Sequence, residues 1–332
     1  MATVITELFS FTEITDGIYF DGKATANAFN LPPTPTAYGS VSGYTHGGQP
    51  NSNVIDKFPF ASDANATDVG NLTRTSTFGS QTGASSLVSG YSVGGGPAPT
   101  SNVIDKYPFA ADGNATDVGD LTQARGNGSG HESDVSGYTA GGQSAPIVNT
   151  IDKFAFATDA NATDVGDLPA IRAWCTDQSS LENGYVSGGN TGSSTQNTIY
   201  KFSFATDGNA TDVANLSQAR NGVVGQSSLI SGYTSGGHTT GLYYPANSNV
   251  IDKFPFASDA NATDVGNLTS AVTTAAGQSS TASGYRSGGI TPPYVATNTI
   301  DKFPFASDAN ATDVGDLTTA SRHQVHGNQS SV

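Results

Sequence analysis

The stretch from Asn249 to Asn267 reads NVIDKFPFASDANATDVGN, and close copies of it recur along the chain. The copies begin at Asn53, Asn102, Asn149, Asn197, Asn249 and Asn298, so the steps between them are 49, 47, 48, 52 and 49 residues. A second motif, Gly-Tyr followed by Gly-Gly, recurs once ahead of each copy of this stretch. A fixed period of this length in a chain of 332 residues is typical of a propeller, a solenoid or another repeat array.

Each unit predicts four short strands, which we call a, b, c and d. In the fifth copy, strand b is expected at Gly232 to Gly237, strand c at Asn249 to Phe256 and strand d at Thr263 to Leu268. The strand a that opens the next unit is expected around Gly277 to Ser280. Apolar residues of strand c lie on both of its faces, which favours a strand buried between two neighbouring sheets. Pro255 lacks a backbone donor, so we expect it at a strand end or a bulge.

The two ends of the repeat complement each other. The first unit begins at strand b with Ser42-Gly43-Tyr44, and the last breaks off at Gln329 to Val332, after strand a. This pattern predicts a ring in which the C-terminal strand a joins the N-terminal strands b, c and d, because closure removes free sheet edges. The sequence therefore predicts an all-β protein, with residues 38–332 forming a six-bladed β-propeller of four-stranded antiparallel blades.

Residues 1–37 precede the repeat. They contain one plausible strand pair, Leu8 to Phe11 and Gly17 to Phe20, followed by a stiff Pro-rich exit at Leu31 to Pro35. Two interpretations stay open: an arm that attaches the protein to a larger assembly, and a strand pair that caps the propeller.

Charge and hydropathy exclude several classes of partner. The net charge of −15 opposes binding to nucleic acid or to an anionic membrane surface. No run of 18 apolar residues is present, so membrane insertion is not expected. The N-terminus lacks the basic and apolar regions of a signal peptide, which predicts synthesis in a cytoplasm without an export signal.

The unit resembles the kelch repeat: a Gly-Gly doublet ends strand b, an Asn opens strand c, an aromatic residue stands near its end, and an Arg leads into strand a. Matching arginines are Arg125, Arg172, Arg220 and Arg322, whereas the usual Trp of strand d is replaced by Val, as at Val265. The sequence of the unit is similar to that of kelch-like repeat proteins of marine tailed phages. The resemblance implies a non-enzymatic virion protein on the particle surface. Its implied partners are other virion proteins, through the N-terminal arm, and a host-surface protein or glycan.

Variation between the copies gathers at one end of the predicted blades, in the b–c loops and d–a segments. The fifth b–c loop, His238 to Ser248, is the longest. Exposed Tyr and Trp give a large contact area at low entropic cost, so such loops are candidate binding surfaces. The candidate residues are Tyr243, Tyr244, Tyr294 and His238 in b–c loops, and Arg125, Trp174 and Arg220 in d–a segments, where they could rim a central channel. Packing against the neighbouring blade is the alternative role for each.

An Asp-Lys pair recurs in strand c, with Tyr200-Lys201 as the exception. Adjacent strand residues point to opposite faces, so each pair places one charge in each of two seams between blades. We expect the Asp to meet an Arg or backbone amides near the next blade, which is a structural role. The Asp residues are Asp56, Asp105, Asp152, Asp252 and Asp301.

The D-A-N-A-T-D-V-G-D stretch is similar to a calcium loop in its alternating oxygen ligands. Its Gly stands at another offset and no Glu closes it, so we expect a hairpin with Asx turns, with calcium as the alternative. The Asn-Ala-Thr triplets match the glycosylation sequon, but without an export signal we interpret their Asn as turn residues.

No cofactor and no metal site are expected, because the chain has five His, one Cys and no catalytic motif. A glycan-binding lectin is the alternative function. An oxidoreductase like the copper-containing kelch propellers is the third, although Cys175 lacks an accompanying Tyr and His constellation.

Overall fold

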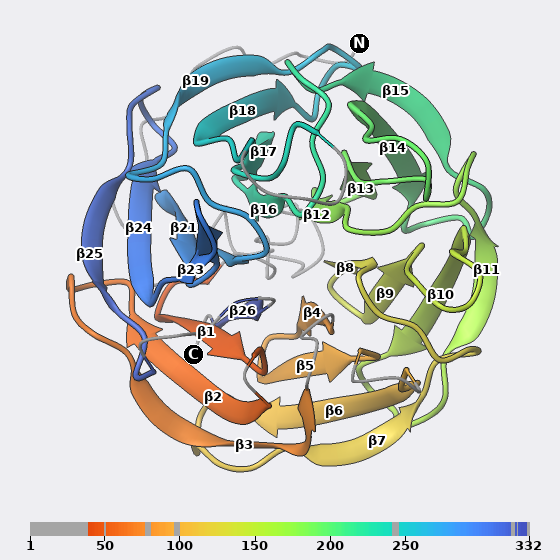
Figure 1. Ribbon diagram of the computed structural model, residues 1–332. Coiled ribbons are helices and arrows are strands. Elements are labelled where there is room, and N and C mark those ends of the chain that lie inside the picture. Colours follow the sequence, from red (N-terminus) through yellow and green to blue (C-terminus); the bar gives the residue numbers. More distant parts are fainter. Residues whose placement is uncertain are drawn as a thin grey trace, which may run out of the picture. The chain divides into compact units, whose positions relative to one another are not determined.

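A computed structural model describes residues 39–49, 51–76, 81–95, 100–240, 246–319, 323 and 325–330. These residues form strands, turns and loops, and no helix occurs among them. Six four-stranded antiparallel sheets stand around a central axis as the blades of a propeller (Figure 1). The predicted fold class is confirmed. Residues 1–37, predicted as an attachment arm, lie outside the described residues, and that prediction stays one.

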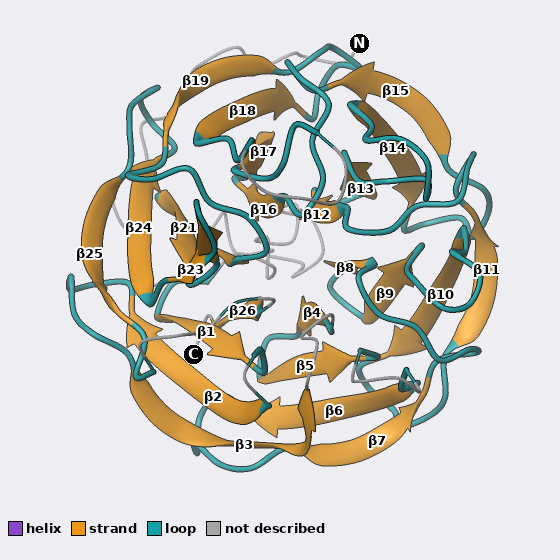
Figure 2. Ribbon diagram, in the orientation of Figure 1, coloured by secondary structure: helices purple, strands orange, loops and turns teal. Residues whose placement is uncertain are grey.

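Strands a, b, c and d follow one another from the axis outward, joined by loops and turns (Figure 2). The innermost strands a are β26 (His326–Ser330), β4 (Thr82–Ser85), β8 (Ser129–Glu132), β12 (Thr176–Ser179), β16 (Val224–Ser227) and β20 (Ala276–Ser279). Strands b are β1 (Ser42–His46), β5 (Ser89–Val93), β9 (Ser136–Ala140), β13 (Asn183–Ser187), β17 (Ser231–Ser235) and β21 (Ser283–Ser287).

The outer half of each blade holds the most repetitive sequence. Strands c are β2 (Ser52–Pro59), β6 (Val103–Pro108), β10 (Thr150–Ala155), β14 (Thr198–Ser203), β18 (Val250–Pro255) and β24 (Thr299–Pro304). Strands d are β3 (Thr67–Ser76), β7 (Thr116–Asp120), β11 (Thr163–Asp167), β15 (Thr211–Asn215), β19 (Thr263–Asn267) and β25 (Thr312–Asp316). A small hairpin, β22 (Ile290–Thr291) with β23 (Val295–Ala296), lies in the last b–c loop. Pro255 ends its strand, as predicted.

The ring closes through the C-terminal strand. Strand β26 pairs antiparallel with β1, so that Ser330 lies opposite Ser42 and His326 opposite His46. The backbone N–H groups of Ser40 and Val41 both donate to the Ser330 carbonyl, at 2.9 and 3.1 Å. Blade 1 therefore combines the two ends of the propeller, and closure is confirmed.

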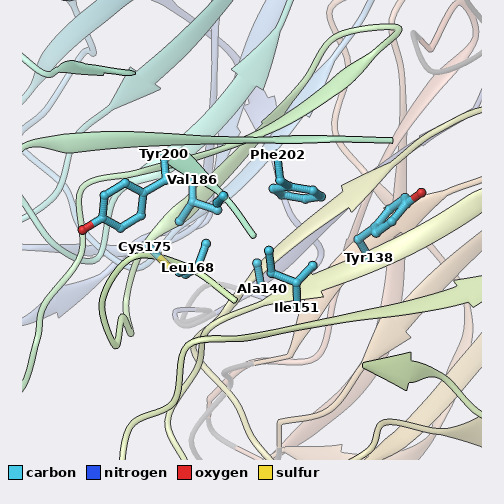
Figure 3. Packing of buried hydrophobic residues seen from close by; sticks show 9 residues of the cluster. Tyr138, Ala140, Ile151, Leu168, Cys175, Val186, Tyr200 and Phe202 are labelled. Carbon is cyan, nitrogen blue, oxygen red and sulfur yellow. The ribbon is translucent and has the colours of Figure 1, made fainter. Parts of the chain in front are cut away.

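The apolar core lies between blades rather than within them. Figure 3 shows one such cluster, in which Tyr138 and Ile151 of blade 3 approach Phe202 of blade 4. The ring of the Tyr in each strand b packs on the ring of the Phe directly after strand c of the next blade, as Tyr91 stacks on Phe156 with ring centroids 5.0 Å apart. The Gly before each Tyr is required by close approach: a Cβ on Gly137 would lie 2.3 Å from the Phe154 ring.

Candidate functional site

The repeated sequence builds the seams between blades. The Asn of each Asn-Ala-Thr triplet accepts a hydrogen bond from a backbone N–H of strand d in the preceding blade, such as Asp120 N to Asn161 Oδ1 at 3.0 Å. The same bond joins Asp316 to Asn65, Asn71 to Asn114, Asp167 to Asn209, Asn215 to Asn261 and Asn267 to Asn310. These Asn side chains therefore tie each blade to its neighbour, besides belonging to a turn.

An ion pair accompanies that bond in every seam. The Lys of strand c meets an Asp in the c–d turn of the next blade, as in Lys253–Asp308 at 2.9 Å. Its counterparts are Lys57–Asp112, Lys106–Asp159, Lys153–Asp207, Lys201–Asp259 and Lys302–Asp63. These groups are partly exposed, so each pair contributes roughly 0.2 to 1 kcal/mol.

The Asp beside each Lys points into the opposite seam. Asp105 accepts from the backbone N–H of Thr73, at 3.2 Å, and from its hydroxyl, at 2.6 Å. Thr73 belongs to β3 of the preceding blade. The equivalent position is filled by Thr122 for Asp152, Ser217 for Asp252, Thr269 for Asp301 and Thr318 for Asp56. The Asp-Lys dipeptide thus places one charge in each seam.

A buried Arg completes three of these carboxylate sites. Arg125 lies 3.1 Å from Asp152 and Arg220 lies 2.6 Å from Asp252, with all four side chains fully buried. In blade 6, Val272 replaces the Arg, and Arg286 from strand b pairs with Asp301 instead. Burial lowers the pKa of Arg286, and the Asp301 carboxylate opposes that shift. The compensation by Arg286 escaped sequence reasoning, because it comes from another strand.

Blade 4 replaces the carboxylate with Tyr200. Its hydroxyl accepts a hydrogen bond from Arg172, whose guanidinium also lies 4.7 Å from the centroid of the Tyr200 ring. Pro169 occupies the position that Thr122 has in the preceding blade, after Leu168 instead of Leu121. Proline has neither an N–H nor a hydroxyl to donate, so a carboxylate at position 200 would lack both donors.

The strands a form a hydrogen-bonded ring around the axis. The backbone N–H of Ser179 donates to the Ser227 hydroxyl at 3.0 Å, and that of Ser227 donates to the Ser279 hydroxyl at 2.9 Å. The ring continues from Ser279 to Gln329 Oε1, from Gln329 to Ser85, from Ser85 to the Glu132 carboxylate and from Glu132 to Ser179. It encloses a narrow axial void of about 60 Å³.

Two carboxyl groups enter this void. Asp177 stands at a position that holds Gly in the other strands a, and a Cβ on Gly225 would lie 1.9 Å from the Asp177 carbonyl. Burial raises the pKa of Asp177 to about 7. Burial, and then the nearby charge of Asp177, raise the pKa of Glu132 well above its ordinary value. Glu132 also accepts from Gln329 Nε2 at 3.1 Å. Both groups therefore keep a proton at pH values where an exposed carboxyl group has lost it.

The structure places the predicted binding residues in different environments. Arg125 and Arg220 are buried inside blades, so their guanidinium groups face Asp152 and Asp252 rather than solvent. His238 is buried, and its backbone forms two hydrogen bonds with that of Asn221.

The remaining candidates lie nearer solvent or outside the described residues. Trp174 is half-buried at the channel mouth, with a left-handed φ of 52°. Its N–H donates to the Asn127 carbonyl at 2.7 Å. Tyr294 is 58% exposed, with its ring 6.2 Å from that of His323. Tyr243 and Tyr244 lie outside the described residues.

The oxygen atoms of the D-A-N-A-T-D-V-G stretch have protein partners. In the first copy, Asp63 pairs with Lys302, Asn65 accepts from Asp316, and Asp68 accepts from the Gly70 N–H at 3.1 Å. Among the described residues, no three His, Cys, Asp or Glu side chains converge as metal ligands. Burial raises the pKa of Cys175 to about 11, which keeps its thiol neutral. No helix in the described part of the chain has the length and apolarity to cross a membrane.

Comparison with known proteins supports the fold. No family model matches the chain, and no curated protein matches it. Solved structures do match, among them one described as "Structure of YjhT", with a TM-score of 0.62 and 14% sequence identity. The match covers 74% of this chain and 86% of that one. At this identity the similarity concerns the β-propeller architecture alone.

Proposed function

We propose that this chain is a non-enzymatic interaction module of a virus particle, with its variable loops turned toward a partner on the host surface. The observation that carries the proposal is that the repeated residues and the variable loops of each unit have different roles. The repeated Asn, Asp, Lys, Tyr and Phe residues are occupied in seams, whereas the b–c loops differ in length and sequence between copies. Residues held in common by all blades build the ring, so partner recognition falls to the loops that differ.

The virion assignment rests on the resemblance of the repeat to kelch-like proteins of marine tailed phages. In this proposal, residues 1–37 attach the protein to other virion proteins and the b–c loops face outward.

The proposal is tested by locating the protein in purified particles. Mass spectrometry of gradient-purified particles is expected to find the chain at a fixed ratio to the main shell protein, and immunogold labelling is expected to mark the particle surface. A chain lacking residues 1–37 is expected to fold but to be absent from particles. Equal incorporation of the truncated chain would remove the arm from the proposal, and absence of the full chain from particles would overturn it.

Glycan binding is the second candidate function. Trp174 is half-buried at the mouth of the axial channel, and the equivalent residues in other blades are Asn127, Gly222 and Thr274. Its left-handed φ is unusual for a bulky residue. An aromatic ring at a concave mouth is a platform on which a sugar ring can stack. A glycan array with the full chain, compared with the Trp174→Ala variant, tests this role. Equal or absent binding by both proteins contradicts it.

A further inference from the structure

The end of the propeller opposite the b–c loops carries a ring of exposed apolar side chains. We call this end the a–b face, because the a–b turns and the c–d turns both lie there. Of the ten exposed large hydrophobic side chains among the described residues, seven stand in a–b turns or at the matching place before β1. They are Val41, Leu87, Val88, Val135, Leu181, Leu229 and Ile230.

Local structure does not require these side chains to be apolar. Each a–b turn is held by its first Ser: Ser228 Oγ accepts from the backbone N–H of Ser231 at 3.0 Å and of Ile230 at 3.4 Å. The carbonyl of the second central residue accepts from strand c, as Ile230 O does from Phe256 N at 2.9 Å. The central side chains themselves project outward, and Ile230 is 73% exposed. Blade 6 builds the same turn with Thr281 and Ala282.

The ring is also hollowed. A groove of about 300 Å³ lies between the turns of blades 2 and 3, with Leu87, Val88 and Val135 on its walls. Phe156 lies in its lining and stacks on Tyr91, so apolar surface is available for an inserted side chain. Exposed apolar surface of this kind, when gathered on one face, marks a binding site more often than scattered residues do.

Acidic groups surround the apolar ring. At this end, each blade contributes an exposed Asp in the c–d turn, which pairs with a Lys, and a second exposed Asp at the start of strand d. The second set is Asp68, Asp117, Asp164, Asp212, Asp264 and Asp313. Each blade thus presents two carboxylates for one ammonium group, and the rim is negative. This charge opposes the pairing of two such faces from two copies of the chain.

We propose that the a–b face is a docking surface for a protein partner that inserts apolar side chains into the turn ring and surrounds them with Lys or Arg. Apolar contacts supply the affinity, and the charge complementarity orients the partner. The described chain begins at Gly39 on this same face, where Ser40 contacts Ser330. This inference rests on the proposed function, in which the face opposite the variable loops turns toward the particle.

Position-specific photo-crosslinking in virus-producing cells tests the proposal. A photoreactive residue replaces Val135, which is 69% exposed on the a–b face, or Val295, which is 55% exposed in a b–c loop and serves as the matched control. The expected result is a crosslink from position 135, but not from 295, to a protein with a basic contact surface. When the crosslinking is repeated in lysates of these cells, the yield should fall in 0.5 M NaCl, because salt screens the charges of the rim.

Substitutions then test the chemistry of the contact. With the photoreactive residue at position 88, Val135→Glu is expected to lower the crosslinking yield about tenfold, because the contact loses the burial of one Val side chain. Val135→Ile and Val295→Glu are expected to leave the yield unchanged. Crosslinks only to a second copy of the chain, from position 295 alone, or from neither position would overturn the docking surface. If position 135 crosslinks as expected but purified particles lack the chain, the docking surface stands and the virion assignment fails.

Discussion

His46 and His326 lie directly opposite each other in the pairing of β1 with β26 that closes the ring. His46 is fully buried, and its Nε2 lies 2.8 Å from Asn328 Oδ1. Burial lowers the pKa of His326 to about 4. His326, in the strand pair that joins the two ends of the propeller, therefore stays neutral at pH 7.

Closure is expected to weaken in acid. The unfolded chain binds a proton at position 326 near pH 6.5, whereas the folded chain resists it until about pH 4, so stability falls as the pH drops between these values. The contribution of this residue is at most about 3 kcal/mol. In His326→Ala, which copies Ala276 of blade 6, urea unfolding at pH 7.5 and pH 5 should differ less than in the parent chain. An unchanged difference would contradict the assignment. His131, whose pKa is lowered to about 3 by burial, accounts for dependence that remains.

Asp177 is expected to have the opposite pH dependence. Its pKa of about 7 means that the folded chain keeps a proton which the unfolded chain releases near pH 4. Stability is therefore lost as the pH rises from about 4 to about 7. Asp177→Asn should stabilise the protein at pH 8 by roughly 2 to 4 kcal/mol and have little effect at pH 3.5, measured by urea unfolding. An equal gain at both pH values would show that the charge is not the cause.

The two ion pairs made by the Asp-Lys dipeptide of one blade, which lie in its two opposite seams, are expected to differ in strength. Arg220→Ala leaves the Asp252 carboxylate buried with the backbone N–H of Ser217 as its remaining donor, and should cost about 3 to 5 kcal/mol. Lys253→Ala removes a partly exposed pair with Asp308 and should cost about 0.2 to 1 kcal/mol. Thermal and urea unfolding measure both. Similar losses for the two variants would mean that burial does not govern these pairs.

Pro169 and Tyr200 are expected to be coupled. Tyr200→Asp alone places a carboxylate where no Thr donates, whereas adding Pro169→Thr restores the N–H and hydroxyl that serve Asp152 in the preceding seam. A double-mutant cycle should therefore give a coupling free energy of about 0.5 to 3 kcal/mol in favour of the pair Thr and Asp. Additive effects would indicate that Tyr200 is held by Arg172 independently of position 169.

Period and strand chemistry made the architecture predictable. Steps near 50 residues, complementary ends and aromatic residues in NVIDKFPF predicted the blade number, the closure and the buried strand c. The direction in which a side chain points within a seam was harder to predict from the sequence, because it depends on the next blade. Arg125 and Arg220 occupy d–a segments, as predicted, but they reach inward to Asp152 and Asp252.

Two other features of the structure left no pattern in the local sequence from which they could be predicted. Arg286 substitutes for an arginine missing at Val272, although the two positions belong to different elements. The apolar a–b face is assembled from one or two residues of each turn, and the turns stand about 50 positions apart, so no window of sequence contains it. Such a surface exists only once the turns stand side by side.

Blade 1 has one property that follows from its composite origin. It is the blade in which strands a and b are not joined by a turn, since Ser330 ends one and Ser40 precedes the other. The two ends of the described part of the chain, Gly39 and Ser330, therefore lie at the same rim of the propeller. The rim that carries the loops of unequal length is the opposite one.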